Sequence, residues 1–165
     1  MSSTTPSEFF VEIKSVATRR VVALRGVIPN YNSQMPLWSR VLTFVEAHNI
    51  PRTGACFAIF YDRGYKESDV DNEVCLPIAM DTAVPDETDG VRVYVLPEMP
   101  RAASVVHTGP YSDLRGVYEQ LFAWIAANGE TCSGPNHEIY HVGVEAVDGD
   151  ESKLVTELLV PLAEQ

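Results

Sequence analysis

The sequence predicts a single α+β domain over residues 1–165, built from two pseudo-symmetric strand–helix–strand–strand repeats with antiparallel sheets and a cleft between the halves. Three observations predict it. The same order of strand-like and helix-like segments occurs twice along the chain. The segments NEVCLPI and TELLVPL place Glu73 and Glu157, 84 residues apart, in one Glu-x-x-x-Pro-aliphatic pattern. Gly26 and Gly109, 83 residues apart, each precede an expected helix. Landmarks at nearly constant spacing favour an internal duplication.

The first repeat is expected over about residues 9–80. Its opening stretch, residues 9–28, is rich in β-branched and apolar side chains, which predicts one long strand or two strands with a bend near residues 17–19. A helix should follow, with Ser33 as its N-cap and Pro36 in its first turn. The segments GACFAIFYD and VDNEVCLPIAM then read as two further strands.

A polar linker containing Pro and Gly, over about residues 81–90, should separate the halves. The second repeat, over about residues 91–163, has the same order of elements, with Ser112 as helix N-cap and Asn128–Gly129 as the helix stop. Each half exposes an apolar sheet face that it cannot bury alone. We therefore expect the halves to meet along their strands, with a ligand-binding cleft at the junction.

The charge balance restricts the partners of the chain. There are 12 Lys and Arg residues against 23 Asp and Glu residues, which gives a net charge of -11. Such a chain repels a phosphate backbone and attracts cations, so direct nucleic-acid binding is not expected. No apolar run approaches the roughly 20 residues needed to cross a bilayer, and the N-terminus lacks the pattern of a signal peptide. We therefore expect a cytoplasmic protein with no membrane partner.

Metal and cofactor sites are not expected. The cysteines, Cys56, Cys75 and Cys132, are odd in number and widely spaced. His137 and His141 would lie roughly 13 Å apart on one strand, which is too far for a single metal ion. The phosphate-loop, dinucleotide-binding, zinc-protease and nucleophile-elbow motifs do not occur in the sequence.

Glu157 is the strongest candidate for a functional residue. It lies in the segment LVTELLVPL, where a carboxylate among Val and Leu side chains is costly to bury without a partner. Glu157 therefore faces solvent, lies at a sheet edge or has a function, and the functional interpretation is favoured. Burial raises the pKa of such a carboxylate unless a cation compensates, and the cation of a ligand could do so. Glu73, its counterpart in the first repeat, has polar neighbours and is expected to be more exposed.

Aromatic residues form the second candidate group, because a flat lipophilic cation binds well between aromatic rings beside a carboxylate. Tyr61 and Tyr140 end strands at matching places in the two repeats, and for both of them a pocket role and a core role are equally favoured. Trp124 and Tyr118 share helical spacing with Leu121 and are expected in the core. The predicted ligand-binding residues are Glu157, Tyr140, Tyr61, Trp38, Phe57 and Glu73.

The run HTGPYSDLRGVYEQLFAWIAANG, followed by GPNHEIY and TELLVPL, resembles the GyrI-like family. This family comprises the effector-binding domain of bacterial multidrug-responsive transcription regulators of the AraC and MerR types and stand-alone proteins. The resemblance extends from about Glu12 to Leu162. It implies two pseudo-symmetric halves and a cleft for lipophilic, often cationic, aromatic compounds. It also implies that Glu157 on the last strand faces the ligand, and it assigns Tyr140 to the tyrosine of the E-I-Y motif.

Three functions remain open at this point. The regulators carry a helix-turn-helix domain ahead of this module, and a short tail precedes the first expected strand here, so we expect a stand-alone member. The first function is sensing or sequestration of lipophilic, cationic aromatic compounds. The second is hydrolysis of electrophilic, cyclopropane-bearing molecules by a carboxylate–phenol set of Glu138, Tyr140 and Glu157, with Glu157 activating water and Tyr140 as the acid. The third is a gyrase-inhibitor-like protein-interaction factor.

Overall fold

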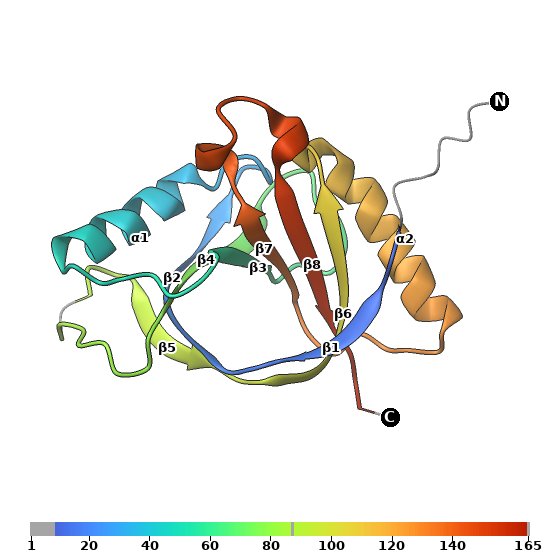
Figure 1. The fold of residues 1–165 in the computed structure, drawn as a ribbon, viewed down its shortest axis with the longest axis horizontal. Helices are drawn as coiled ribbons and strands as arrows, with labels where there is room; N and C mark the ends of the chain where they lie inside the picture. Colours follow the sequence, from blue (N-terminus) through green and yellow to red (C-terminus); the bar gives the residue numbers. More distant parts are fainter. Residues whose placement is uncertain (1–8, 87, 165) are drawn as a thin grey trace.

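The computed structural model of the protein describes residues 9–86 and 88–164 (Figure 1). Its two α-helices are α1 (Met35–Ala47) and α2 (Leu114–Ala127). Three short 3-10 turns cover Tyr111–Asp113, Val144–Ala146 and Glu151–Lys153. The strands are β1 (Glu12–Val16), β2 (Arg19–Ile28), β3 (Phe57–Phe60), β4 (Val70–Ile78), β5 (Arg92–Leu96), β6 (Met99–Thr108), β7 (Asn136–Val142) and β8 (Val155–Pro161).

The strands form one curled antiparallel sheet, with the order β1-β6-β8-β7-β3-β4-β2-β5. From one edge to the centre the strands are β1, β6, β8 and β7. From the other edge to the centre they are β5, β2, β4 and β3, which are the corresponding strands of the other half. The halves are joined where β3 pairs with β7, from Phe57 opposite Ile139 to Phe60 opposite Asn136. The predicted α+β fold with antiparallel strands is confirmed, and the sheets of the two halves are continuous.

A bend between β1 and β2 carries the chain from one half of the sheet to the other. β1 pairs with β6, and Val16 is the last residue of this ladder, opposite Met99. β2 pairs with β5, and this ladder begins with Arg19 opposite Leu96. The bend expected near residues 17–19 is therefore present, and the two halves exchange their edge strands. The strand that opens the first half in sequence lies beside the second half in space.

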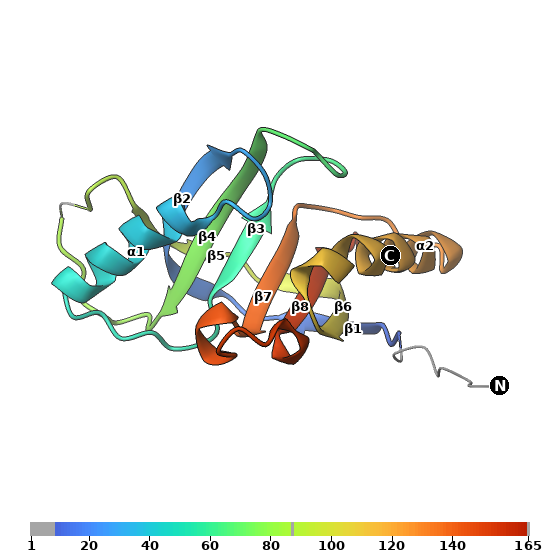
Figure 2. The ribbon, with the colours of Figure 1, turned by 90° about the horizontal axis from the view of Figure 1, so that it is seen from above.

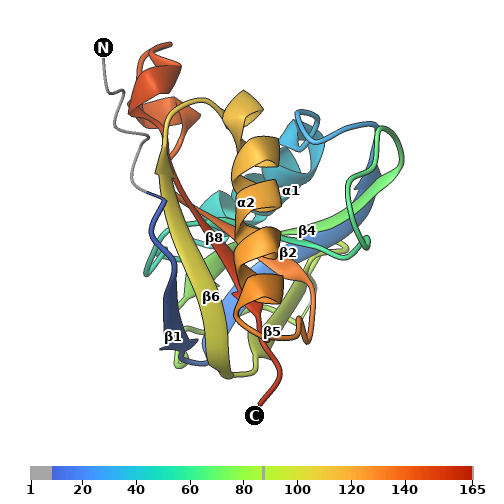
Figure 3. The same cartoon turned by 90° about the vertical axis from the view of Figure 1, so that its right-hand side faces the viewer.

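The helices pack on the outer parts of one sheet face and leave its centre between them. Helix α1 buries Val41, Phe44 and Val45 against β2 and β4. Helix α2 buries Leu121 and Ile125 against β6 and β8. Seen from above, the helices lie at opposite ends of the molecule with β3 and β7 between them (Figure 2). The end view shows α2 in front of the strands of the second half (Figure 3).

The predicted N-caps were wrong, although the helices begin close to them. The N-cap of α1 is Gln34, and Pro36 lies in the first turn as predicted. Helix α2 follows a 3-10 turn and has Asp113 as its N-cap, so Ser112 lies inside that turn. Neither N-cap side chain accepts a hydrogen bond from its helix. Both N-cap residues have helical backbone angles, whereas a side-chain cap needs an extended residue.

The opposite face of the sheet carries its own core. Val21, Ala23, Phe57, Ile59 and Cys75 pack together there, all nearly inaccessible to solvent. Because side chains alternate along a strand, each central strand contributes to both cores. Within the described residues, no helix is long and apolar enough to cross a membrane.

We expect Leu121→Ala to lower the free energy of unfolding by about 2–5 kcal/mol, because it leaves a cavity in the core beneath α2. Leu121 is 0% exposed, whereas Leu42 on α1 is 43% exposed. Leu42→Ala removes the same atoms and should change stability by less than about 1 kcal/mol. Urea unfolding followed by circular dichroism measures both. Equal losses would contradict this assignment of the core.

Candidate functional site

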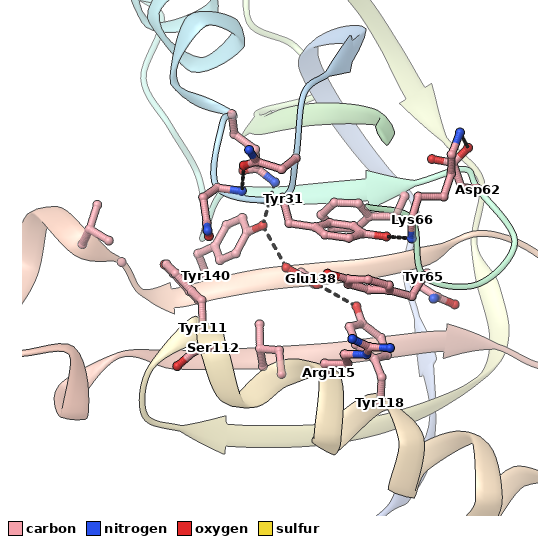
Figure 4. A pocket seen from close by; sticks show the side chains of 18 of the residues that line it. Tyr31, Asp62, Tyr65, Lys66, Tyr111, Ser112, Arg115, Tyr118, Glu138 and Tyr140 are labelled. Carbon is pink, nitrogen blue, oxygen red and sulfur yellow. Dashed lines mark hydrogen bonds and ion pairs between the residues drawn. The ribbon is translucent and has the colours of Figure 1, made fainter. Parts of the chain in front are cut away.

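A pocket lies between α1 and α2, over the central strands β3 and β7 (Figure 4). Its volume is about 1080 Å³. Both halves of the chain line it, so the expected cleft between the halves is present. The floor comes from β3 and β7. The walls come from the two helices, from the turns that precede them and from the turn between β3 and β4. The residues that line it include Tyr31, Gln34, Trp38, Phe60, Tyr65, Tyr111, Arg115, Tyr118, Phe122, Glu138 and Tyr140.

Glu138 on β7 is the buried acid of this pocket, with 8% of its surface exposed. Glu138 and Tyr140 are two residues apart on one strand and therefore point to the same face. The Tyr140 hydroxyl donates to Glu138 Oε1 at 3.1 Å. The Tyr118 hydroxyl, from α2, donates to Oε2 at 2.9 Å. Figure 4 shows both phenols pointing at the carboxylate.

The environment of Glu138 disfavours its charged form. Burial raises its pKa to about 7, although the hydrogen bonds from Tyr118 and Tyr140 act in the opposite direction. The same burial, together with the nearby carboxylate, raises the pKa of both phenols well above the usual value, so they remain donors. Among the described residues, no Lys, Arg or His forms an ion pair with Glu138. Within the described part of the chain, this acid therefore has two phenol donors and no ion-pair partner.

A chain of hydrogen bonds ties α1 to the same carboxylate. Trp38 Nε1 donates to Gln34 Oε1 at 3.0 Å, and Gln34 Nε2 donates to the Tyr140 hydroxyl at 3.3 Å. The Tyr140 hydroxyl in turn donates to Glu138. Groups from α1, α2 and β7 thus converge on one buried acid and hold it in a defined orientation.

Aromatic rings form much of the pocket wall. Tyr31 and Tyr65 stack with their centroids 5.4 Å apart and their planes at 29°. Tyr31 also packs on Phe60 at 5.6 Å, and its hydroxyl accepts a hydrogen bond from the Lys66 backbone N–H at 3.1 Å. On the other side, Tyr111 meets Tyr140 edge to face at 5.9 Å.

Two of the six residues predicted to bind a ligand, Trp38 and Tyr140, line this pocket. Trp124 packs against the core beneath α2, as expected. Tyr118 packs against that core too, as expected, and its hydroxyl also reaches Glu138 in the pocket.

The sequence left open whether Glu157 is buried. The structure buries it, but on the opposite face of the sheet, away from this pocket. The residue is 3% exposed, and its carboxylate contacts Lys14, Ser104 and His141 at 2.5, 2.5 and 2.8 Å. Burial opposes its ionisation, but the hydrogen bonds from these three residues outweigh burial and lower its pKa. Lys14 of the protein thus supplies the compensating cation that a ligand could have provided.

Glu73, Tyr61 and Phe57 also lie on the opposite face. Glu73 is fully buried, so the expectation that it is exposed was wrong. Tyr61 and Tyr94 donate to its Oε1 at 2.5 and 2.9 Å, and Arg92 lies 3.6 Å from Oε2. Phe57 belongs to the core of that face. A ligand-binding role for these three residues and for Glu157 remains a prediction.

Strand register explains why Tyr61 and Tyr140 lie on opposite faces of the sheet. Ile59 pairs with Glu73, and Ile139 pairs with Glu157, so the residue that corresponds to Tyr61 is His141. The contacts agree, since Tyr61 binds Glu73 as His141 binds Glu157. Tyr140 is one residue earlier than His141, and a shift of one residue moves a side chain to the other face.

The remaining pocket residues had a partial signal in the sequence. The alternation in NHEIYHV places Glu138 beside Tyr140, and this pair already belonged to the carboxylate–phenol set considered above. Tyr65, Tyr111 and Arg115 had no signal of this kind. They come from two turns and a helix end, and they meet only when the chain is folded.

Comparison with known proteins places the chain in a family. The model of the GyrI-like small molecule binding domain matches residues 9–163. Among solved structures, the EcmrR C-terminal domain superposes with a TM-score of 0.85 at 24% identity, covering 95% of this chain and 99% of that one. In the EcmrR–DNA complex the same match covers 58% of the EcmrR chain.

A hydrolase from Listeria innocua superposes with a TM-score of 0.68 at 13% identity, covering 94% of this chain and 93% of that one. At these identities the likeness shows a shared fold. No curated protein matches the chain. The family model covers nearly the whole chain, and the curled sheet with its helix-flanked pocket agrees with it. The chain belongs to the family of GyrI-like small molecule binding domains.

Proposed function

We propose that the chain binds lipophilic, cationic aromatic small molecules in the pocket between α1 and α2, as a sensing or sequestering protein. The observation that carries the proposal is the buried carboxylate of Glu138, which has two phenol donors and no ion pair among the described residues. An ionised carboxylate in such a place is destabilised, and a bound cation would relieve the destabilisation. Binding energy is therefore available to a ligand that brings a positive charge.

The walls of the pocket support an aromatic ligand. Aromatic faces attract cations and also provide apolar contact surface. The net charge of -11 favours the approach of a cation over that of an anion. Glu157 and Glu73 lie in contact with basic groups of the protein, so they have less to gain from an external cation.

A second candidate function is hydrolysis of an electrophilic, cyclopropane-bearing molecule, with Glu138 in the place first assigned to Glu157. The contact between Glu138 and two phenols favours it, because a carboxyl group with a pKa of about 7 suits a general base. Water would bond to the electrophilic ring carbon as Glu138 takes its proton. The ring bond would break as Tyr140 protonates the leaving atom.

We expect Glu138→Gln to weaken binding of rhodamine 6G, a planar aromatic cation, by about 10-fold or more, because the variant loses the charge that faces the ligand. Fluorescence polarisation titration at pH 8 measures the affinity. Glu157→Gln is the matched control on the other face and should retain the parent affinity. Thermal melting verifies that both variants fold. A loss confined to Glu157→Gln would transfer the site to the other face, and a parent that does not bind the dye would refute the proposal.

The stability of the parent should fall as the pH rises from about 4.5 to about 7, relative to Glu138→Gln. The folded state holds the Glu138 proton over this window, whereas the unfolded state has lost it, because the folded pKa is raised. The glutamine does not titrate. The free energy of unfolding of Glu138→Gln, relative to that of the parent, should therefore rise by an amount on the order of 2–3 kcal/mol across the window. Urea unfolding at pH 4.5, 6 and 8 measures it, and a constant difference would contradict the raised pKa.

Turnover separates the two candidate functions. A binding protein protects a reactive cyclopropane electrophile from water or DNA in a one-to-one ratio, whereas a hydrolase consumes many equivalents. If the chain is an enzyme, Glu138→Gln and Tyr140→Phe should each reduce kcat by about 100-fold or more. Product formation followed by mass spectrometry measures this. If each protein molecule protects one equivalent of the electrophile and no product forms, the hydrolase function is excluded.

A further inference from the structure

Three side chains on the pocket wall form a stack, in the order Tyr31, Tyr65, Arg115. The rings of Tyr31 and Tyr65 are stacked, and the guanidinium carbon of Arg115 lies 4.0 Å from the Tyr65 centroid. Figure 4 shows Tyr31 and Arg115 on opposite sides of Tyr65. Tyr65 lies in the turn between β3 and β4, whereas Arg115 is on α2. The Arg115–Tyr65 contact therefore joins the two halves across the pocket.

Both faces of Tyr65 are thus occupied by the protein. A ligand ring can stack on Tyr65 only after one neighbour leaves. Tyr31 is held by its contact with Phe60 and by a hydrogen bond from the Lys66 backbone. Arg115 is held more weakly, because its side chain is 62% exposed and its ion pair with Glu119 is 3.8 Å long. Arg115 is therefore the neighbour that can move.

We infer that Arg115 is a specificity-determining residue whose guanidinium holds the stacking place on Tyr65 that a planar, delocalised aromatic cation takes when it binds. A guanidinium is flat and its charge is delocalised, so the space that it leaves on the ring fits a flat cation better than a tetrahedral one. Displaced toward solvent, Arg115 can still pair with Glu119, which lies four residues later on the same helix. The inference rests on the proposed function and narrows it to one ligand class.

Substitution of Arg115 tests whether a planar cation replaces the guanidinium on the Tyr65 ring. Arg115→Gln removes the resident cation and should raise the affinity for rhodamine 6G by about 2- to 5-fold, the size of one exposed cation–π contact. Arg115→Lys keeps the charge but loses the flat stacking group, and it should also bind more tightly than the parent. The gain for tetrabutylammonium, measured by calorimetry, should be smaller in both variants. Lys153→Gln makes the same charge change on a 70% exposed side chain outside the pocket and should leave the affinity unchanged.

Two patterns of affinity would overturn the inference. If Arg115→Gln binds more tightly but Arg115→Lys binds like the parent, Arg115 acts only through charge repulsion. If both variants bind more weakly, Arg115 contacts the ligand and does not yield its place to it.

A second measurement needs no ligand. Trp38 lines the pocket, whereas Trp124 does not, so Trp124→Phe leaves Trp38 as the only tryptophan reporter. Acrylamide should quench Trp38 more strongly when Arg115→Gln is added, because the contact across the pocket is lost. Unchanged quenching would overturn the inference even if the dye binds. Increased quenching in a protein that binds no dye would refute the proposed function and, with it, the ligand exchange, while the contact across the pocket would stand.

Discussion

Strands β3 and β7 hydrogen-bond to each other at the centre of the sheet, and each belongs to a different half of the chain. This pairing determines where the pocket can be. The helices cover the strands on either side of the pair (Figure 2), and the pocket lies between them, above the centre of the sheet. The floor of the pocket is made of β3 and β7 side chains. A pocket between two helices is a common site for small molecules.

The alternation of strand side chains places the three buried glutamates of the sheet in two different environments. Glu73 and Glu157 point to the face opposite the helices, where basic and hydroxyl groups of the protein surround them. Glu138 points to the helix face, where phenols surround it. The first two acids form ion pairs with basic groups of the protein, whereas the third forms none with any residue that the structure describes. Burial without compensation is a property expected of a site that receives a charge from outside.

The orientation of Glu138 depends on residues far apart in the sequence. Tyr118 comes from α2, and Tyr140 is oriented by Gln34 and Trp38 from α1. Side chains locked by such a network lose little further freedom when a ligand binds, which favours affinity. At the wall, the stack of Tyr31, Tyr65 and Arg115 joins a turn of one half to a helix of the other. Floor and wall therefore both require the two halves to be correctly placed.

The sequence by itself determined the α+β class and the repeated order of elements. These features depend on local periodicity and on spacing along the chain, which a single sequence displays. Only the tertiary structure decided which buried acid faces the pocket. A shift of one residue moves a strand side chain to the other face, so Tyr140 and Glu138 separate from Tyr61 and Glu157 although the patterns look alike. The wall residues Tyr65 and Arg115 meet through space and have no shared pattern in sequence, and the cation beside Glu157 comes from Lys14, which is more than a hundred residues away.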